Sequence, residues 1–108
     1  MGSTSDGLIS QLRRFRRKLE KCYDIERMIL FGSHARGQAG RFSDVDLIIV
    51  SKKFRRKGAI ERASPLYLEW DLRLPVDFLC YTPEEFRVCS RRGGLIREAL
   101  HEGIQISS

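Results

Sequence analysis

Residues 47–50 read Leu-Ile-Ile-Val, a run with no polar side chain. A strand that is apolar at every position is buried on both faces, which is typical of a central strand packed by helices. The residues directly before this run include Asp44 and Asp46, so two carboxylates stand where the strand begins. The run therefore predicts a sheet that is covered by helices and carries acidic side chains at one end.

Length and charge limit what can surround this strand. The chain has 108 residues, 42% of them hydrophobic, which predicts a single domain over residues 1–108 whose core needs no metal or disulfide. Twenty lysines and arginines against fourteen acidic residues give a net charge of +6. Anionic partners such as nucleotides, nucleic acid or an acidic protein are therefore favoured.

The expected location is the cytoplasm. No apolar run is long enough to span a membrane, and residues 1–6 lack the basic-then-apolar order of a secretory signal, so no membrane partner is expected. The three cysteines, Cys22, Cys80 and Cys89, form neither a disulfide framework nor a CxxC pair. We expect them to be reduced.

Hydrophobic periodicity predicts helices that alternate with short strands. One apolar stripe between residues 8 and 22 follows the repeat of an amphipathic helix. Thr82-Pro83-Glu84-Glu85 has the order of a capping box, so a helix should start there and run to about residue 89. The other expected elements are strands over 27–31, 45–50 and 76–81, a helix over 59–70 that Pro65 starts or breaks, a helix over 95–100 capped by Gly103, and an edge strand over 104–106.

The segment 32–37, Gly-Ser-His-Ala-Arg-Gly, lies where a strand ends and a short helix is expected. Glycine permits a tight turn and free N–H groups at a helix start bind anions, so Gly32 and Ser33 are candidates for holding a polyphosphate. The alternative is a simple turn between two elements. Arg36 fits two roles equally, a phosphate ligand or a surface ion-pair partner. His34 is expected to be structural.

Three aspartates are candidate metal ligands. Asp44 and Asp46 are two residues apart, so on a strand their carboxylates project from the same face. Like charges that close need a cation, and oxygen ligands suit Mg²⁺, although a solvated acidic turn is the alternative. Asp77 lies between two apolar residues on another expected strand, where an acid is costly to bury unless something pairs with it. A metal shared by all three acids would supply that pairing.

These strings resemble the nucleotidyltransferase superfamily of DNA polymerase beta, and the short length is similar to its minimal nucleotidyltransferase branch. The resemblance covers residues 27–86 and is carried by GSHARG at 32–37, SDVDLIIV at 43–50 and PVDFLCYTPEEF at 75–86. It implies an α+β fold of the α/β two-layer kind, a mixed sheet flanked by helices with all three acids on one face. It also implies an enzyme that transfers a nucleoside monophosphate and releases pyrophosphate.

The resemblance also implies roles for individual positions. Gly32 and Ser33 match the turn that binds the β- and γ-phosphates of a nucleoside triphosphate. Asp44 and Asp46 match the acids that hold two Mg²⁺ ions, and Asp77 matches the acid that ligates the second ion and helps to deprotonate the acceptor hydroxyl. Such a two-metal site agrees with the chemistry of an in-line displacement, which needs little covalent help from the protein.

Larger members of the superfamily use an extra domain to seat the base and the acceptor. A chain of 108 residues has no room for it, so we expect either a second polypeptide that completes the site or an acceptor that is itself a protein. Members of the minimal branch are commonly paired with a helical HEPN-domain partner as antitoxin and toxin. The resemblance thus implies transfer of AMP from ATP to a hydroxyl of that partner, for example on a tyrosine. Self-association into a homo-oligomer is a further expectation.

Two other interpretations stay open. The basic face of the first helix and the run 52–57 fit a non-catalytic module that binds nucleic acid or an acidic partner, although charge runs are usually solvated surfaces. A catalytically inactive antitoxin is the third interpretation, and the presence of all three acids argues against it. Tyr67, Trp70 and Tyr81 fit stacking on a base, but core packing is the simpler expectation, as it is for Cys80.

Overall fold

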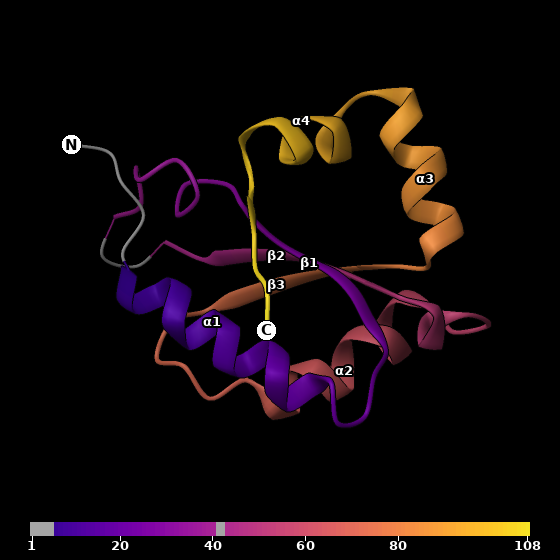
Figure 1. Cartoon of the computed structure of the whole chain (residues 1–108), viewed down its shortest axis with the longest axis horizontal. Helices are drawn as coiled ribbons and strands as arrows, with labels where there is room; N and C mark the ends of the chain where they lie inside the picture. The colour runs from indigo at the N-terminus through magenta and orange to yellow at the C-terminus, as the bar shows by residue number, and fades with distance from the viewer. Residues whose placement is uncertain (1–5, 41–42) are drawn as a thin grey trace.

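The computed structural model describes residues 6–40 and 43–108. The expectation that the chain starts without a signal segment rests on residues 1–6, of which 1–5 lie outside the described part. Figure 1 shows the order of the helices and strands along the chain. They are α1 (Asp6–Leu19), β1 (Ile25–Phe31), β2 (Val45–Ser51), a short 3-10 helix (Lys52–Phe54), α2 (Ala59–Glu69), β3 (Val76–Tyr81), α3 (Pro83–Arg92), α4 (Leu95–Glu102) and β4 (Ile104–Gln105).

Within the described residues the strands form one mixed sheet in the order β3-β2-β1-β4 (Figure 1). β2 is antiparallel to β1 and parallel to β3, and β4 is antiparallel to β1. β2 is therefore an inner strand, and its residues 47–50 are at most 1% exposed, as the apolar run predicts. Because of this topology, the C-terminal end of β1 lies at the same end of the sheet as the N-terminal ends of β2 and β3. The connection over residues 32–44 thus brings the Gly-Ser turn to the acidic end of β2.

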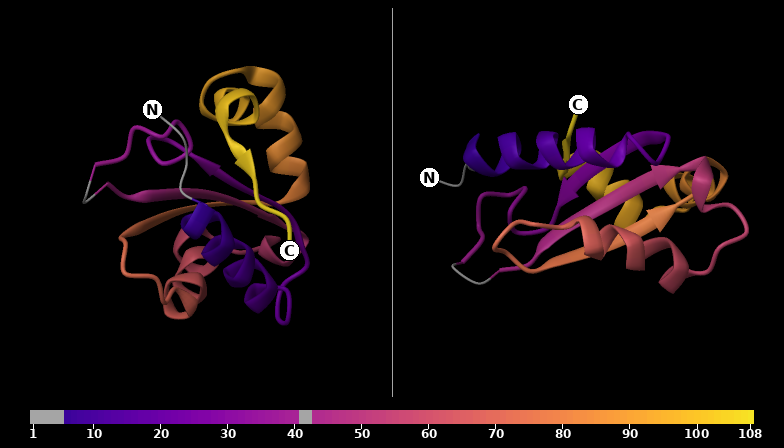
Figure 2. Two further views of the ribbon diagram at one scale, coloured as in Figure 1. Left: turned by 60° about the vertical axis from the view of Figure 1, so that its left-hand side comes forward. Right: turned by 90° about the horizontal axis from the view of Figure 1, so that it is seen from below.

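α1 and α2 cover one face of the sheet (Figure 2). The apolar stripe of α1, including Phe15, packs in one cluster with Leu47 and Ile49 of β2, Phe78 of β3 and Leu66 of α2. Burial of a side chain of this size contributes roughly 1.5–3 kcal/mol. This cluster is the larger of the two that fill the core, and it makes the first face a continuous apolar layer.

α3 and α4 cover part of the opposite face. Ile29, Ile48 and Val50 point to this side and pack with Phe86 of α3 and Ile96 of α4. The sheet thus lies between two pairs of helices (Figure 2). The α+β class and the mixed sheet flanked by helices are as predicted. Cover on both faces of the inner strand is also as predicted from its apolar run.

Pro65 lies inside α2, so the expectation that it starts or breaks the helix is wrong. The helix runs from Ala59 to Glu69 without interruption. Proline removes one backbone hydrogen bond and crowds the carbonyl four residues earlier, which here belongs to the exposed first turn. The next residue, Leu66, is fully buried against the sheet, and this packing holds the helix together across the defect.

α3 begins with the predicted capping box. The Thr82 hydroxyl accepts a hydrogen bond from the Glu85 amide at 3.1 Å, and the Glu85 carboxylate accepts one from the Thr82 amide at 2.9 Å. Pro83 occupies the first turn, where its missing N–H costs nothing. The helix continues to Arg92, three residues beyond the expected end, and stops at Gly93, which has a φ of 80°.

Trp70 and Tyr81 are partly buried, in line with the simpler expectation of core packing, whereas Tyr67 is 45% exposed. Tyr67, Trp70 and Tyr81 pack against phenylalanine rings at centroid distances of 4.9, 5.0 and 6.5 Å. Cys80 packs against the first cluster, and burial raises the pKa of its thiol to about 12. All three cysteines are free of disulfide bonds. In the part of the chain that the structure describes, no helix is both long and apolar enough to cross a membrane.

Candidate active site

The register between β2 and β3 places Asp46 directly beside Asp77. Residues in register on neighbouring strands project to the same face, so both carboxylates leave the same side of the sheet. Asp44 lies one residue before β2 and two residues before Asp46, and its negative charge acts on the Asp46 carboxylate. Asp46 and Asp77 therefore project from one face at one end of the sheet, and Asp44 lies at the same end.

This end of the sheet is open. Asp46 and Asp77 share their face with Ile48 and Leu79, which lie in the cluster under α3 and α4. Figure 1 shows α3 toward the end of the sheet that is opposite the 32–44 connection, so the acids lie beyond its cover. Asp44 and Asp77 are exposed and Asp46 is partly exposed. A ligand can therefore approach the carboxylates from solvent.

Gly32 packs directly against the carboxylate of Asp46. Phe31, the last residue of β1, is paired with Asp46, and the chain then turns at Gly32 with a φ of +75°. A Cβ atom at this position would collide with Oδ2 of Asp46 and lie 3.3 Å from its Cγ. Glycine is thus required both by the backbone conformation and by the close approach of the carboxylate.

The segment after Gly32 is a compact series of turns rather than the expected short helix. The amides of Ala35 and Arg36 both donate to the carbonyl of Gly32, at 3.1 and 3.2 Å, and the Gln38 amide donates to the carbonyl of Ser33 at 2.8 Å. The glycine at position 37, with a φ of 69°, and the next two residues lead the chain away before a regular helix forms. The turn still starts at Gly32 and keeps Ser33 at the end of β1.

His34 joins the turn to the start of β2. Its Nε2 atom lies 2.9 Å from the carbonyl oxygen of Ser43, the residue before Asp44. The Ser43 hydroxyl in turn accepts a hydrogen bond from the Gly40 amide at 2.8 Å. The His34 contact is structural, as expected, but the sequence did not predict that its partner would be the carbonyl group of Ser43. The only available signal was that His34 and Ser43 belong to the two motifs whose ends must meet.

Arg36 is exposed and pairs at the surface. Its guanidinium lies 3.9 Å from the Glu102 carboxylate of α4 and donates to the Gln38 side chain at 3.3 Å. Of the two roles that the sequence allows, the ion pair is the one seen in this structure. The positive charge of Arg36 also favours the ionised form of Asp46 and so lowers the pKa of that carboxyl.

The electrostatics of the site centre on Asp46. Burial of its carboxylate raises the pKa of Asp46, and the negative charges of Asp77 and Asp44 raise it further. His34 and Arg36 oppose this effect and lower the pKa. The ionised carboxylate is therefore held in an unfavourable field that added positive charge would relieve.

The donor set fits a hard divalent cation, because the three acids offer only carboxylate oxygens and repel one another. Among residues 6–40 and 43–108, however, no group of three or more His, Cys, Asp or Glu side chains is arranged to hold a metal ion. The carboxylates thus share an end of the sheet without forming a closed set of ligands. Substrate phosphates commonly complete the coordination of Mg²⁺.

The open end of the mixed sheet thus joins a glycine turn to a carboxylate that lies directly against it. The model of the nucleotidyltransferase domain family matches residues 9–106 of the chain. The chain therefore belongs to the nucleotidyltransferase domain family.

A solved structure agrees at the level of the fold. The crystal structure of a candidate nucleotidyltransferase from Sulfolobus solfataricus superposes with a TM-score of 0.63 and 18% sequence identity, over 90% of this chain and 77% of that one. At this identity the likeness concerns the fold alone. No curated protein matches the sequence closely.

Proposed function

We propose that this protein catalyses metal-dependent transfer of AMP from ATP to a hydroxyl group of an acceptor protein. The observation that carries the proposal is the pairing of Asp46 with Asp77 in register, with Gly32 packed on the Asp46 carboxylate. This arrangement joins a turn that fits phosphates to acids that fit cations, and a nucleoside triphosphate with divalent metal needs both.

The proposed reaction is an in-line displacement at the α-phosphorus. The acceptor hydroxyl oxygen bonds to that phosphorus, and the bond from the phosphorus to the oxygen that bridges it to the β-phosphate breaks. Pyrophosphate leaves with this oxygen and the electron pair of the bond. The hydroxyl proton passes to the carboxylate of Asp77 and from there to solvent.

Each predicted site residue has a role in this scheme. The backbone at Gly32 and the hydroxyl of Ser33 bind the β- and γ-phosphates, and Arg36 neutralises a phosphate after it leaves Glu102. Two Mg²⁺ ions held by the three aspartates, when bound, neutralise charge on the attacking and leaving oxygens. Asp44 and Asp46 would each bind both ions, and Asp77 would be a further ligand of the second ion.

The proposed acceptor is a HEPN-domain partner, so that the protein acts as the antitoxin of a toxin–antitoxin pair. The support is the resemblance of the sequence to the minimal nucleotidyltransferase branch, together with a net charge of +6 that favours an anionic partner. The exposed position of Asp77 is consistent with an acceptor that approaches from outside the chain.

The direct test follows the α-phosphate. The purified protein is incubated with Mg²⁺, the protein encoded next to it as the proposed HEPN-type acceptor, and ATP labelled at either the α- or the γ-phosphate. We expect label on the partner from α-labelled ATP only, and none when EDTA is added. Asp46→Asn should abolish labelling. Asp24→Asn, which removes an exposed aspartate that pairs with Lys52, is the matched control and should keep it. Absence of label with the unaltered protein would exclude this acceptor.

A binding module without catalysis is the second candidate, favoured by exposed cations on α1. Fewer cations of α1 are available to a partner than the sequence suggests. The guanidinium of Arg16 donates to the carbonyls of Ile106 and Ile25, at 2.7 and 3.1 Å, and so stabilises the fold. Arg13 and Arg17 remain exposed. Nucleic-acid affinity that falls steeply with salt and is unchanged by Asp44→Asn would favour this candidate over the enzyme.

A further inference from the structure

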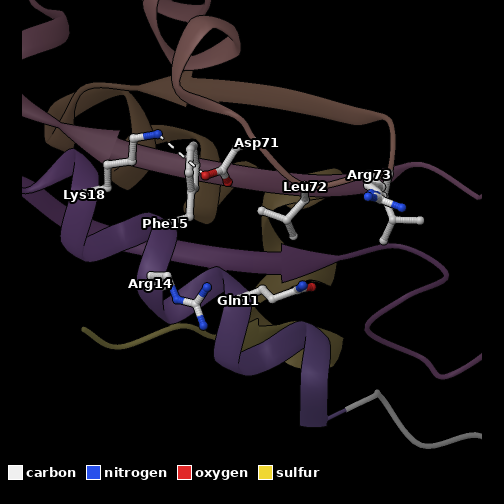
Figure 3. Close-up of a pocket in the computed structure, with 8 residues that line it drawn as sticks. Gln11, Arg14, Phe15, Lys18, Asp71, Leu72 and Arg73 are labelled. Carbon is white, nitrogen blue, oxygen red and sulfur yellow. Dashed lines mark ion pairs between the residues drawn. The ribbon is translucent and has the colours of Figure 1, made fainter.

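A cavity of about 360 Å³ lies between α1 and the segment over residues 71–74 that leads into β3. Its floor is made by Phe15 and Leu72, which belong to the first core cluster, whereas the two paired acids of the candidate active site project from the opposite face. Figure 3 shows α1 along one wall and the 71–74 segment along the other. The cavity is thus a separate feature of the molecule. Its lining residues are Gln11, Arg14, Phe15, Lys18, Asp71, Leu72, Arg73 and Leu74.

The cavity carries an excess of positive charge. The cavity also contains the carboxylate of Asp71, which lies 3.8 Å from the ammonium nitrogen of Lys18. A dashed line marks this ion pair at one end of the view in Figure 3. Arg73 lies at the other end of the view. Neither Arg14 nor Arg73 has a hydrogen-bond or ion-pair partner among the described residues. Two guanidinium groups without such a partner among residues 6–40 and 43–108 therefore line one cavity, and its carboxylate, Asp71, lies beside Lys18.

The walls of the cavity are held in place by contacts of their own. The indole N–H of Trp70 donates to the carbonyl of Leu74 at 2.8 Å, which closes the 71–74 segment into a loop. Lys18 donates to the carbonyl of Glu69 at 2.9 Å and ties the start of this segment to α1. The Phe15 ring is fixed against Trp70 at a centroid distance of 5.0 Å. A ligand would therefore meet a site whose backbone is already ordered, which lowers the entropic cost of binding.

The side chains of the cavity match a phosphate ester. A guanidinium offers five N–H donors in a planar fork, so Arg14 and Arg73, with the Gln11 amide, present more donors than the two oxygens of a carboxylate can accept. A phosphomonoester has three terminal oxygens and a higher charge, so it accepts more of these hydrogen bonds than a carboxylate does. Leu72 and Leu74 offer an apolar surface to the organic part of the ligand. A volume of about 360 Å³ is in the range of small-molecule sites.

We propose that this cavity is a second anion site, which binds the phosphate group of a phosphate ester through Arg14, Arg73 and Gln11. The ester is either a small free phosphomonoester or the terminal phosphate of a nucleic-acid strand, since both present the same group. The site is independent of the proposed transfer reaction, because it uses none of the residues of the acidic end.

The test measures backbone amide shifts by NMR without divalent metal. The probes are phenyl phosphate, benzoate as its carboxylate counterpart, and a thymidine pentanucleotide that carries a 5′-phosphate. Phenyl phosphate should shift the amides of residues 11–18 and 71–74 and bind at least about tenfold more tightly than benzoate. Shifts confined to residues 32–37 would report the other site and overturn the proposal, as would equal binding of benzoate.

Charge variants show whether the cavity, rather than the general surface, carries the affinity. Arg14→Gln and Arg73→Gln should each weaken phenyl phosphate binding about tenfold. Arg17→Gln removes the same charge from an exposed position of α1 outside the cavity and should change it less than about twofold. An equal loss in all three variants would overturn the proposal.

The pentanucleotide distinguishes the two sources of the phosphate. Tighter binding than phenyl phosphate at residues 11–18 and 71–74, with a steep salt dependence, assigns the site to a nucleic-acid strand. Equal or weaker binding at these residues assigns it to a small phosphate ester. Either result requires the same losses in Arg14→Gln and Arg73→Gln.

Discussion

The two ends of β2 differ although they belong to the same strand and the same face. Val50 is 1% exposed and lies with Ile48 in the cluster that α3 and α4 cover. Asp46, four residues earlier, is partly exposed and lies beside Asp77 and Gly32. The covered end provides burial and therefore stability. The open end holds like charges together and provides a site, at a cost in stability that the covered end offsets.

The largest expected effect tests the covered end. Ile48→Ala removes a fully buried side chain from the second cluster, so the free energy of unfolding should fall by about 2–5 kcal/mol, from lost burial and the cavity left behind. Urea denaturation measures this loss. A change within about 0.5 kcal/mol, as at surface positions, would show that α3 and α4 do not form a tight cover.

The next prediction tests the open end. Asp46→Asn should lower the rate of AMP transfer by at least about 10²–10³-fold, because the proposed metal and phosphate contacts depend on this carboxylate. Without metal the same change should raise the melting temperature, since it removes a charge that Asp77 and Asp44 disfavour. Addition of Mg²⁺ should then stabilise the unaltered protein more than the variant. A variant that is both active and less stable would contradict the comparison.

The pH dependence of this effect has a definite sign. The pKa of Asp46 in the folded protein lies above its ordinary value of 3.8, so the folded state binds this proton more tightly than the unfolded chain. Stability from this group is complete below pH 3.8 and is lost as the pH rises through the folded pKa. The stability gained by Asp46→Asn should therefore appear as the pH rises through that window, and thermal scans without metal measure it.

Particular residues show how far sequence reasoning reaches. The apolar run at 47–50 predicts the inner strand, and the spacing of Asp44 and Asp46 predicts their common side. The register that sets Asp46 beside Asp77 needs the parallel pairing of β2 and β3, which depends on how the intervening α2 packs against the sheet. Local patterns contain no such information, and the resemblance to a family supplied it instead.

Details that depend on tertiary packing were missed. Pro65 breaks helices by its local chemistry, but burial of Leu66 overrides it. The contact between His34 and the carbonyl of Ser43 joins residues nine positions apart across an irregular connection, and no periodicity predicts it. The sequence allows Arg36 to be either a phosphate ligand or an ion-pair partner, because the position of its partner Glu102 depends on how α4 packs.

A smaller effect is expected at the glycine that contacts the acidic end. Gly32→Ala should destabilise the protein by about 1–2 kcal/mol for the positive φ alone, and further because its Cβ meets the Asp46 carboxylate. Gly94→Ala is the matched control, since Gly94 has a φ of 83° and open space where a Cβ would lie. Chemical denaturation measures the free energy of unfolding of both variants. Equal losses of stability would show that the Asp46 side chain moves away from the new Cβ atom at no cost.

The covered end can be loosened at its edge, where α3 begins. Thr82→Ala removes the side-chain half of the capping box and should cost about 1 kcal/mol. Its effect should be confined to stability, because Thr82 lies at the end of β3 that is opposite Asp77. Unfolding and AMP transfer measured on the same sample test this. A drop in the transfer rate without a drop in stability would mean that the two ends are coupled.

The smallest effect concerns the ion pair beside this cap. The hydrogen bond from Arg62, 2.6 Å from the Glu85 carboxylate, is the main reason why the pKa of Glu85 lies below its ordinary value of 4.5. A lowered carboxyl pKa stabilises the fold above the ordinary value and loses this contribution as the pH falls through the folded pKa. Glu85→Gln keeps a side chain that completes the capping box but removes the charge, so it should cost less than about 1 kcal/mol at pH 7. The difference from the unaltered protein should vanish in acid, where both side chains are neutral, and denaturation at pH 7 and at a pH below the folded pKa of Glu85 measures it. A difference that is the same at both pH values would show that shape rather than charge holds α3 at the covered end.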